Sequence, residues 1–136
     1  MTVFCGPSIG AEALAVAQRI ARQGSPIDLT ADRLDHTESY TKTLFVQFKG
    51  SAAVRQMFQI AKGYSPRSNY VLNPHLSLLY KKLPAPKRQE LCEALDVPMG
   101  DYAFDRIRMI ETELPIEDEG PVRRWRVVCD EALGRR

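Results

Sequence analysis

The 136-residue chain has only two histidines, three cysteines and a formal net charge of +2. A charge this small does not favour a broad electrostatic surface for nucleic acid, although it leaves room for a local basic pocket. Cys5, Cys92 and Cys129 are odd in number and lack the spacing of metal ligands. We therefore expect reduced, buried thiols rather than a disulfide framework or a zinc site.

Several segments and motifs are also missing. No apolar run is long enough to span a bilayer, and the start of the chain lacks the basic and apolar regions of a signal peptide. These observations predict a cytoplasmic protein that does not bind a membrane. No glycine-rich phosphate loop, Cys-His metal pair or Ser-His-acid order occurs, and the acidic run 111–119, a predicted hairpin tip, lacks the pattern of a metal-binding loop. We expect neither a metal nor a cofactor.

The most informative segment is the run 73–80, Asn-Pro-His-Leu-Ser-Leu-Leu-Tyr. It alternates as a strand does, which places His75 and Ser77 on one face and Tyr80 on the other. An imidazole that titrates near neutral pH suits proton transfer, and a hydroxyl two residues away can donate to an anionic oxygen. The two side chains can therefore act on one substrate group.

The two halves of the chain repeat the same order of strand, helix, strand and strand. Thr2 matches Ser77 in this alignment. The matched segments are 1–5 with 76–80, 11–23 with 86–95, 28–34 with 103–109, and 43–48 with 125–129. Self-similarity of this length favours a duplicated supersecondary unit.

This repeat predicts a single α+β domain over residues 1–136. Two similar lobes of mainly antiparallel sheet, each backed by helix, would lie around a central cleft and be related by an approximate two-fold axis. The lobe-like halves are expected at about 1–62 and 74–136. They would be joined by the connector 63–73, which is rich in Gly, Ser and Pro. A further helix, begun by a Ser51 cap, is expected to end at residues 62–63.

In the alignment, the position that matches His75 falls immediately before Met1. Either a first histidine precedes the printed sequence, or the first copy of the motif has none.

The run 74–80 resembles the second signature of the cyclic phosphodiesterases in the 2H phosphoesterase superfamily, which carry two His-x-Thr/Ser motifs. The resemblance extends from residue 31 to about 130, and residues 2–4 are similar to the end of the first signature. It implies metal-independent hydrolysis of a cyclic phosphodiester, of the nucleoside 2′,3′-cyclic phosphate or ADP-ribose cyclic phosphate type. His75 would be catalytic, and Ser77 and Thr2 would bind the substrate phosphate. The first motif is cut at Met1.

Three further residues are candidates for substrate binding: Tyr80, Tyr40 and Lys42. Tyr80 belongs to the family signature, although its face of an ideal strand equally suits core packing. Lys42 could approach the phosphate or remain a surface cation. His36 is followed by Thr37, but consecutive residues of a strand face opposite sides, so we favour a solvated turn histidine.

The expected partner is a small cyclic nucleotide or an RNA end. Two alternatives remain open at this point. One is a catalytically impaired relative that binds a nucleotide or RNA end, and the other is an interaction domain in which His75 is a core residue. Oligomeric state is not predicted.

Overall fold

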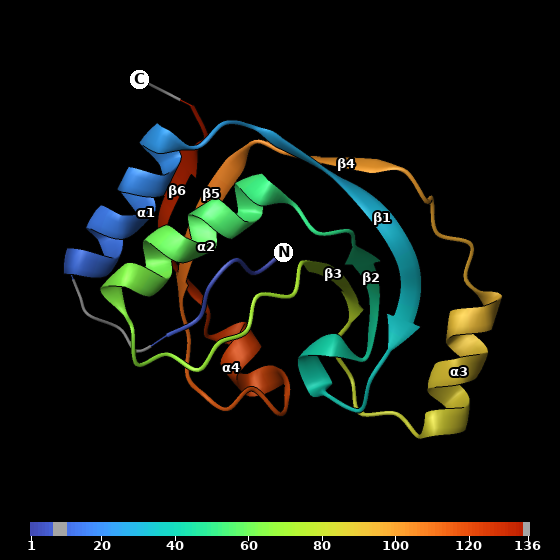
Figure 1. The fold of residues 1–136 in the computed structure, drawn as a ribbon. Helices are drawn as coiled ribbons and strands as arrows, with labels where there is room; N and C mark the ends of the chain where they lie inside the picture. The colour runs from blue at the N-terminus through green and yellow to red at the C-terminus, as the bar shows by residue number, and fades with distance from the viewer. Residues whose placement is uncertain (7–10, 135–136) are drawn as a thin grey trace.

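The computed structural model describes residues 1–6 and 11–134. Helices and curved antiparallel sheets alternate along these residues, which confirms the predicted α+β class (Figure 1). In chain order the elements are α1 (Ala11–Gln23), β1 (Ile27–His36), the 3-10 turn η1 (Tyr40–Lys42), β2 (Leu44–Phe48), α2 (Ala52–Tyr64), β3 (His75–Leu79), α3 (Ala85–Ala94), β4 (Asp101–Phe104), β5 (Arg106–Glu111), α4 (Glu119–Arg123) and β6 (Arg126–Ala132).

The strands form a four-stranded sheet in the order β3-β2-β1-β4 and a two-stranded sheet of β5 and β6. The long strand β1 changes partner along its length, because residues 27–30 pair with β4 and residues from Ala31 onward pair with β2. The predicted strand 103–109 is divided in the same way. It breaks at Asp105, whose carbonyl oxygen accepts a hydrogen bond from the Leu133 N–H at 2.8 Å. On either side of this break, β4 pairs with β1 and β5 pairs with β6.

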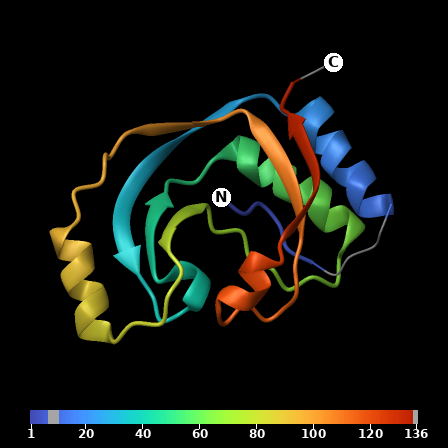
Figure 2. The same ribbon diagram turned by 180° about the vertical axis from the view of Figure 1, so that it is seen from behind.

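Both halves of the sequence contribute to each side of the molecule. Strand β3, from the second half, pairs with β2 from the first, and α1 packs against β5 and β6. Helix α3 packs against β1. The β2–β3 pair and the β5–β6 pair lie on opposite sides of the N-terminus, as opposite views show (Figures 1 and 2). The division at the connector 63–73 therefore stays a prediction about the sequence repeat, since the elements interleave in space.

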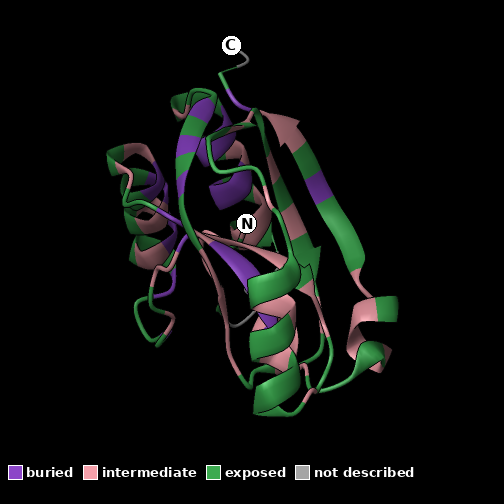
Figure 3. Cartoon of the chain, turned by 90° about the vertical axis from the view of Figure 1, so that its right-hand side faces the viewer, coloured by how far each residue is buried: buried purple, intermediate pink, exposed green. Residues whose placement is uncertain are grey.

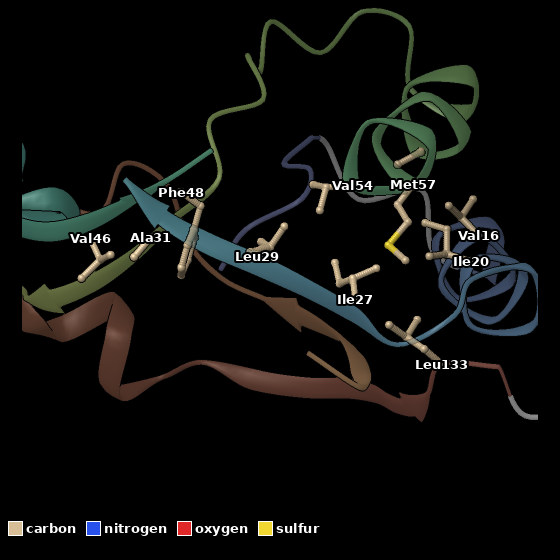
Figure 4. Close-up of a cluster of buried hydrophobic side chains, with 11 residues drawn as sticks. Val16, Ile20, Ile27, Leu29, Ala31, Val46, Phe48, Val54, Met57 and Leu133 are labelled. Atoms are coloured by element: carbon tan, nitrogen blue, oxygen red, sulfur yellow. The ribbon is translucent and has the colours of Figure 1, made fainter. Parts of the chain in front are cut away.

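Buried apolar side chains from α1, α2, β1 and β2 form the core (Figure 4). Along β1, Ile27, Leu29 and Ala31 are buried and alternate with exposed polar residues, because successive strand residues face opposite sides. Val16 and Ile20 of α1 meet them from one helix, and α2 adds Val54, Met57 and Ala61. Helix α3, in the foreground of Figure 3, has no buried residue and lies outside this core.

The helices follow the sequence closely. Helix α1 has the predicted bounds, and the Ser51 hydroxyl oxygen accepts a hydrogen bond from the Val54 N–H at 3.4 Å to cap α2. This contact satisfies one of the N–H groups that the first turn of a helix leaves unpaired. Helix α3 begins with Pro86 in its first turn, where a missing N–H costs nothing.

The predicted strand over residues 1–5 is wrong. These residues form no strand in the structure, and side-chain contacts hold them instead. The Phe4 ring lies 6.1 Å from that of Phe58, and the Ser68 hydroxyl donates to the Cys5 carbonyl oxygen at 2.5 Å. The hydroxyl of Tyr70 donates to the Thr2 carbonyl oxygen at 3.1 Å. With these contacts, the segment packs over the core without joining a described sheet edge.

Two other local predictions need correction. The acidic run is predicted to form a plain hairpin tip, but the short helix α4 lies between β5 and β6, capped by an Asp118 carboxylate that accepts from the Gly120 N–H at 2.8 Å. Of the three thiols, only Cys129 is buried, and Cys5 and Cys92 are partly exposed. All three are free. Among the described residues, no helix is both long and apolar enough to cross a membrane.

Candidate active site

The register between β2 and β3 positions His75. Gln47 lies opposite His75 and Phe45 lies opposite Ser77, and directly opposed residues of antiparallel strands share a face. The imidazole of His75 meets the Phe45 ring edge-on, with 5.6 Å between ring centres and 76° between planes. Strand pairing therefore directs His75 and Ser77 to the same side of the sheet, beside a buried aromatic ring.

A hydrogen bond fixes the tautomer of His75. Its Nδ1 lies 2.7 Å from the Asn73 carbonyl oxygen. Because a carbonyl can only accept, Nδ1 carries the proton, and in the neutral ring the lone pair is on Nε2. The Gln47 side-chain amide donates to Asn73 Oδ1 at 2.7 Å and to the Pro74 carbonyl at 2.9 Å. This network holds the segment directly before β3 that orients the imidazole.

The surroundings lower the pKa of His75. Partial burial is the largest cause, the hydrogen bond to Asn73 acts in the opposite direction, and the positive charges of Lys42 and the Met1 ammonium lower the pKa further. A lowered pKa increases the neutral fraction of the ring near pH 7. His75 is therefore suited to take a proton through Nε2 as a general base.

Ser77 is engaged with the turn η1. Its hydroxyl donates to the Thr41 carbonyl oxygen at 2.7 Å. A serine hydroxyl has one proton, so while this bond is present Ser77 can accept from a ligand but cannot donate to a phosphate oxygen. To fill the phosphate-binding role predicted for it, the hydroxyl must rotate away from Thr41.

Lys42 is brought to the same side by η1, which packs beside β3. Its Nζ lies 4.1 Å from the centre of the Phe45 ring, a cation–π contact. Burial lowers the pKa of Lys42, and the negative charge of Asp35 partly offsets this effect. Lys42 and His75 thus contact the same phenyl ring, and the lysine charge is close enough to influence the imidazole.

We expect Lys42→Met to raise the pKa of His75, because the substitution removes a nearby positive charge that disfavours the imidazolium. NMR titration of the His75 ring signals measures this pKa directly. The exposed Lys82 provides a matched control, and Lys82→Met should leave the His75 pKa in place. An unchanged or lower pKa in Lys42→Met would mean that the lysine charge does not reach the imidazole.

Thr2 is exposed, and its backbone carbonyl accepts the hydrogen bond from the Tyr70 hydroxyl. The N-terminal ammonium is partly buried, which lowers its pKa, and its charge also affects His75. The N-terminal segment therefore reaches the neighbourhood of His75. A phosphate-binding role for the Thr2 hydroxyl stays a prediction.

Tyr40 and Tyr80 lie together, with ring centres 6.2 Å apart, and a third aromatic residue joins them. The ring centre of Trp125 lies 6.1 Å from that of Tyr80. The sequence reasoning did not assign Trp125, Phe45 or Asn73 to the site. The repeat contained no signal for Trp125, because it matches only the segments 43–48 and 125–129 and includes no predicted site residue there.

Two features lie outside this group of residues. His36 ends β1, and its Nδ1 accepts a hydrogen bond from Arg88 Nε of α3 at 3.5 Å. A hollow of about 170 Å³ lies between α1 and α2 and contains no predicted site residue; Ile20, Met57 and Ile60 are among its lining residues. Within residues 1–6 and 11–134, no three His, Cys, Asp or Glu side chains lie close enough to hold a metal ion.

Comparison with known proteins gives structural likeness only. No family model and no curated protein matches the sequence. The crystal structure of TT0787 of Thermus thermophilus superimposes with a TM-score of 0.60 at 18% identity, covering 97% of this chain and 74% of that protein. The crystal structure of E. coli LigT complexed with 3′-AMP gives a TM-score of 0.56 at 16% identity, covering 98% of this chain and 76% of LigT.

Proposed function

We propose that this chain, which has the fold of the 2H phosphoesterase superfamily, hydrolyses a cyclic phosphodiester of the nucleoside 2′,3′-cyclic phosphate or ADP-ribose cyclic phosphate type. The observation that carries the proposal is the imidazole of His75, whose Nδ1 is held by the Asn73 carbonyl so that Nε2 bears the lone pair, on the same side of the sheet as Ser77 and Lys42. The arrangement combines a proton acceptor, a hydroxyl and a cation. The reaction is proposed to need no metal.

In the proposed reaction, the imidazole, the hydroxyls and the lysine each have one role. Nε2 of His75 takes a proton from water as the water oxygen attacks phosphorus, and the bond from phosphorus to one ribose oxygen breaks. The leaving oxygen takes a proton from a second group, which the paired-motif hypothesis assigns to a histidine aligned just before Met1. The product is a phosphate monoester. Ser77 and Thr2 would donate to the non-bridging oxygens, and Lys42 would offset their negative charge.

One observation favours a second candidate function. Of the two histidines, His75 is the one that the described structure places beside Ser77 and Lys42, whereas His36 contacts Arg88. A site with one imidazole keeps its hydroxyl and cation but leaves one proton transfer to water. Such a protein would bind a nucleotide or RNA end and turn it over poorly. The bound 3′-AMP named for LigT supports a nucleotide as the ligand to try first.

We expect the chain to bind AMP with a shift of the His75 ring signals, because the phosphate would lie beside the imidazole. If the protein is a phosphodiesterase, it should also open a nucleoside 2′,3′-cyclic phosphate at a rate that added EDTA does not lower. Binding without turnover would support the second candidate. Loss of activity with EDTA would contradict a metal-independent mechanism, and unmoved His75 signals at saturating AMP would exclude both functions.

A further inference from the structure

Thr43 is a polar residue that is only 1% exposed, at the junction of η1 and β2. Its hydroxyl donates to the Lys81 carbonyl oxygen at 2.5 Å and accepts from the Lys81 N–H at 3.1 Å. The pairing of β2 with β3 ends at Leu44 and Leu79, so Lys81 lies beyond the last paired residues of the two strands. The Thr43 side chain thereby holds both backbone groups of Lys81 at a point where strand pairing no longer does.

The same hydroxyl lies against the backbone of η1. Thr43 Oγ1 is 3.1 Å from the Tyr40 carbonyl oxygen and 3.2 Å from that of Ser39, and these acceptors share a single hydroxyl proton. A second hydroxyl, that of Thr37, donates to the Lys42 carbonyl oxygen at 2.5 Å. The turn η1 is three residues long, and none of them is buried. Its position therefore depends on these hydrogen bonds rather than on burial of its own side chains.

η1 carries two contacts of the candidate active site. The Thr41 carbonyl oxygen accepts from the Ser77 hydroxyl at 2.7 Å, and Lys42 Nζ lies 4.1 Å from the centre of the Phe45 ring. The His75 imidazole meets the same ring. A long, flexible lysine side chain keeps a fixed place only where its backbone is fixed. A displacement of η1 would therefore move both contacts together.

We propose that Thr43 is a positioning residue whose buried hydroxyl holds η1 against the end of β3. It thereby fixes where Lys42 and the Thr41 carbonyl lie. This inference rests on the proposed function, which places the substrate phosphate beside these groups, at His75 and Ser77. Thr43 does not act on the substrate itself and works through the backbone of η1.

Thr43→Val replaces the hydroxyl with a methyl group of similar size and leaves the Lys81 N–H and carbonyl without this partner. We expect η1 to loosen and Lys42 to spend less time on the Phe45 ring. The pKa of His75 should then rise, as in Lys42→Met, because a positive charge that disfavours the imidazolium lies farther away. NMR titration of the His75 ring signals measures this pKa.

A double variant shows whether the effect passes through Lys42. Thr43→Val combined with Lys42→Met should have the same His75 pKa as Lys42→Met alone, because no lysine charge is left to displace. The Met1 ammonium, which also lowers the His75 pKa, lies on a separate segment and is present in every variant. A further shift in the double variant would mean that Thr43 affects His75 by another route, and would contradict the inference.

Three more variants complete the test, with circular dichroism to verify folding. Thr43→Ser keeps the hydroxyl and should restore the wild-type His75 pKa. Thr30→Val makes the same chemical change at an exposed position of β1, where the hydroxyl donates to Asp101 at 2.6 Å, and should leave the His75 pKa unchanged. Thr43→Cys, whose thiol is a weak donor and acceptor, replaces Thr43→Val if that variant does not fold, and should shift the pKa in the same direction.

Turnover gives a second readout. Folded Thr43→Val should lower kcat/KM for a nucleoside 2′,3′-cyclic phosphate by about ten- to hundredfold, because misplaced groups orient the substrate poorly. If it keeps the His75 pKa and the kcat/KM of the wild type, the inference is wrong and the proposed function stands. If the wild-type protein neither binds AMP nor opens the cyclic phosphate, the proposed function is wrong, and the pKa comparison still supports or overturns the hold of Thr43 on η1.

Discussion

His75→Ala should lower turnover of a nucleoside 2′,3′-cyclic phosphate by about a hundred- to ten-thousandfold, the contribution of one positioned acid or base. The variant loses the Nε2 lone pair that Asn73 orients and that a lowered pKa keeps unprotonated near neutral pH. Since the side chain is half-buried on a strand that stays paired through its backbone, the fold should survive. Steady-state kinetics and circular dichroism measure the two effects.

His36→Ala is the matched control, because this imidazole contacts Arg88 and should contribute little to turnover. The pH dependence gives a second readout for His75. Activity that requires its neutral form should fall as the pH drops through the pKa of His75, and this limb should lie at lower pH than for an unperturbed histidine. A His75→Ala enzyme that kept most of its activity would rule out His75 as the base.

Leu29→Ala should lower the free energy of unfolding by about 2–5 kcal/mol, the cost of deleting a buried leucine side chain. Leu29 is 1% exposed and lies on β1 within the core that α1 and α2 cover (Figure 4). The substitution removes contacts and leaves a cavity that close-packed neighbours fill only in part. Denaturant unfolding of the two proteins measures the difference.

Leu114→Ala makes the same chemical change at a side chain that is 64% exposed, and should alter the free energy of unfolding by about 0.5 kcal/mol or less. Equal losses in the two variants would mean that β1 does not lie at the centre of the core. A loss in Leu29→Ala well below that of a buried leucine would lead to the same conclusion.

Local features of the structure follow from the sequence because their causes are local. A serine before an apolar run caps α2, a proline is accommodated in the first turn of α3, and alternation along β1 divides buried Ile27 and Leu29 from exposed Asp28 and Thr30. The same alternation assigns His75 and Ser77 to one face. The α+β class follows from the order of these elements.

Contacts between distant segments decide the remaining features. Residues 1–5 alternate well enough for a strand, but aromatic packing on Phe58 and bonds from Ser68 and Tyr70 hold them without a sheet partner. No local pattern marks the break at Asp105, which arises where the chain passes from pairing with β1 to pairing with β6. Periodicity indicates which face of a strand a residue occupies, but it does not indicate which other strand it pairs with.

The sequence by itself determined helices α1, α2 and α3, the strand that carries His75, and the spacing of an imidazole and a hydroxyl two residues apart on one face, because each depends on spacing along one element. The tertiary structure decided which ring nitrogen of His75 carries the lone pair and that the Ser77 hydroxyl donates to Thr41. It also brought Lys42 over the Phe45 ring and Trp125 against Tyr80. These depend on register and on chain segments up to 45 residues apart in the numbering, from Tyr80 to Trp125, which only folding brings together.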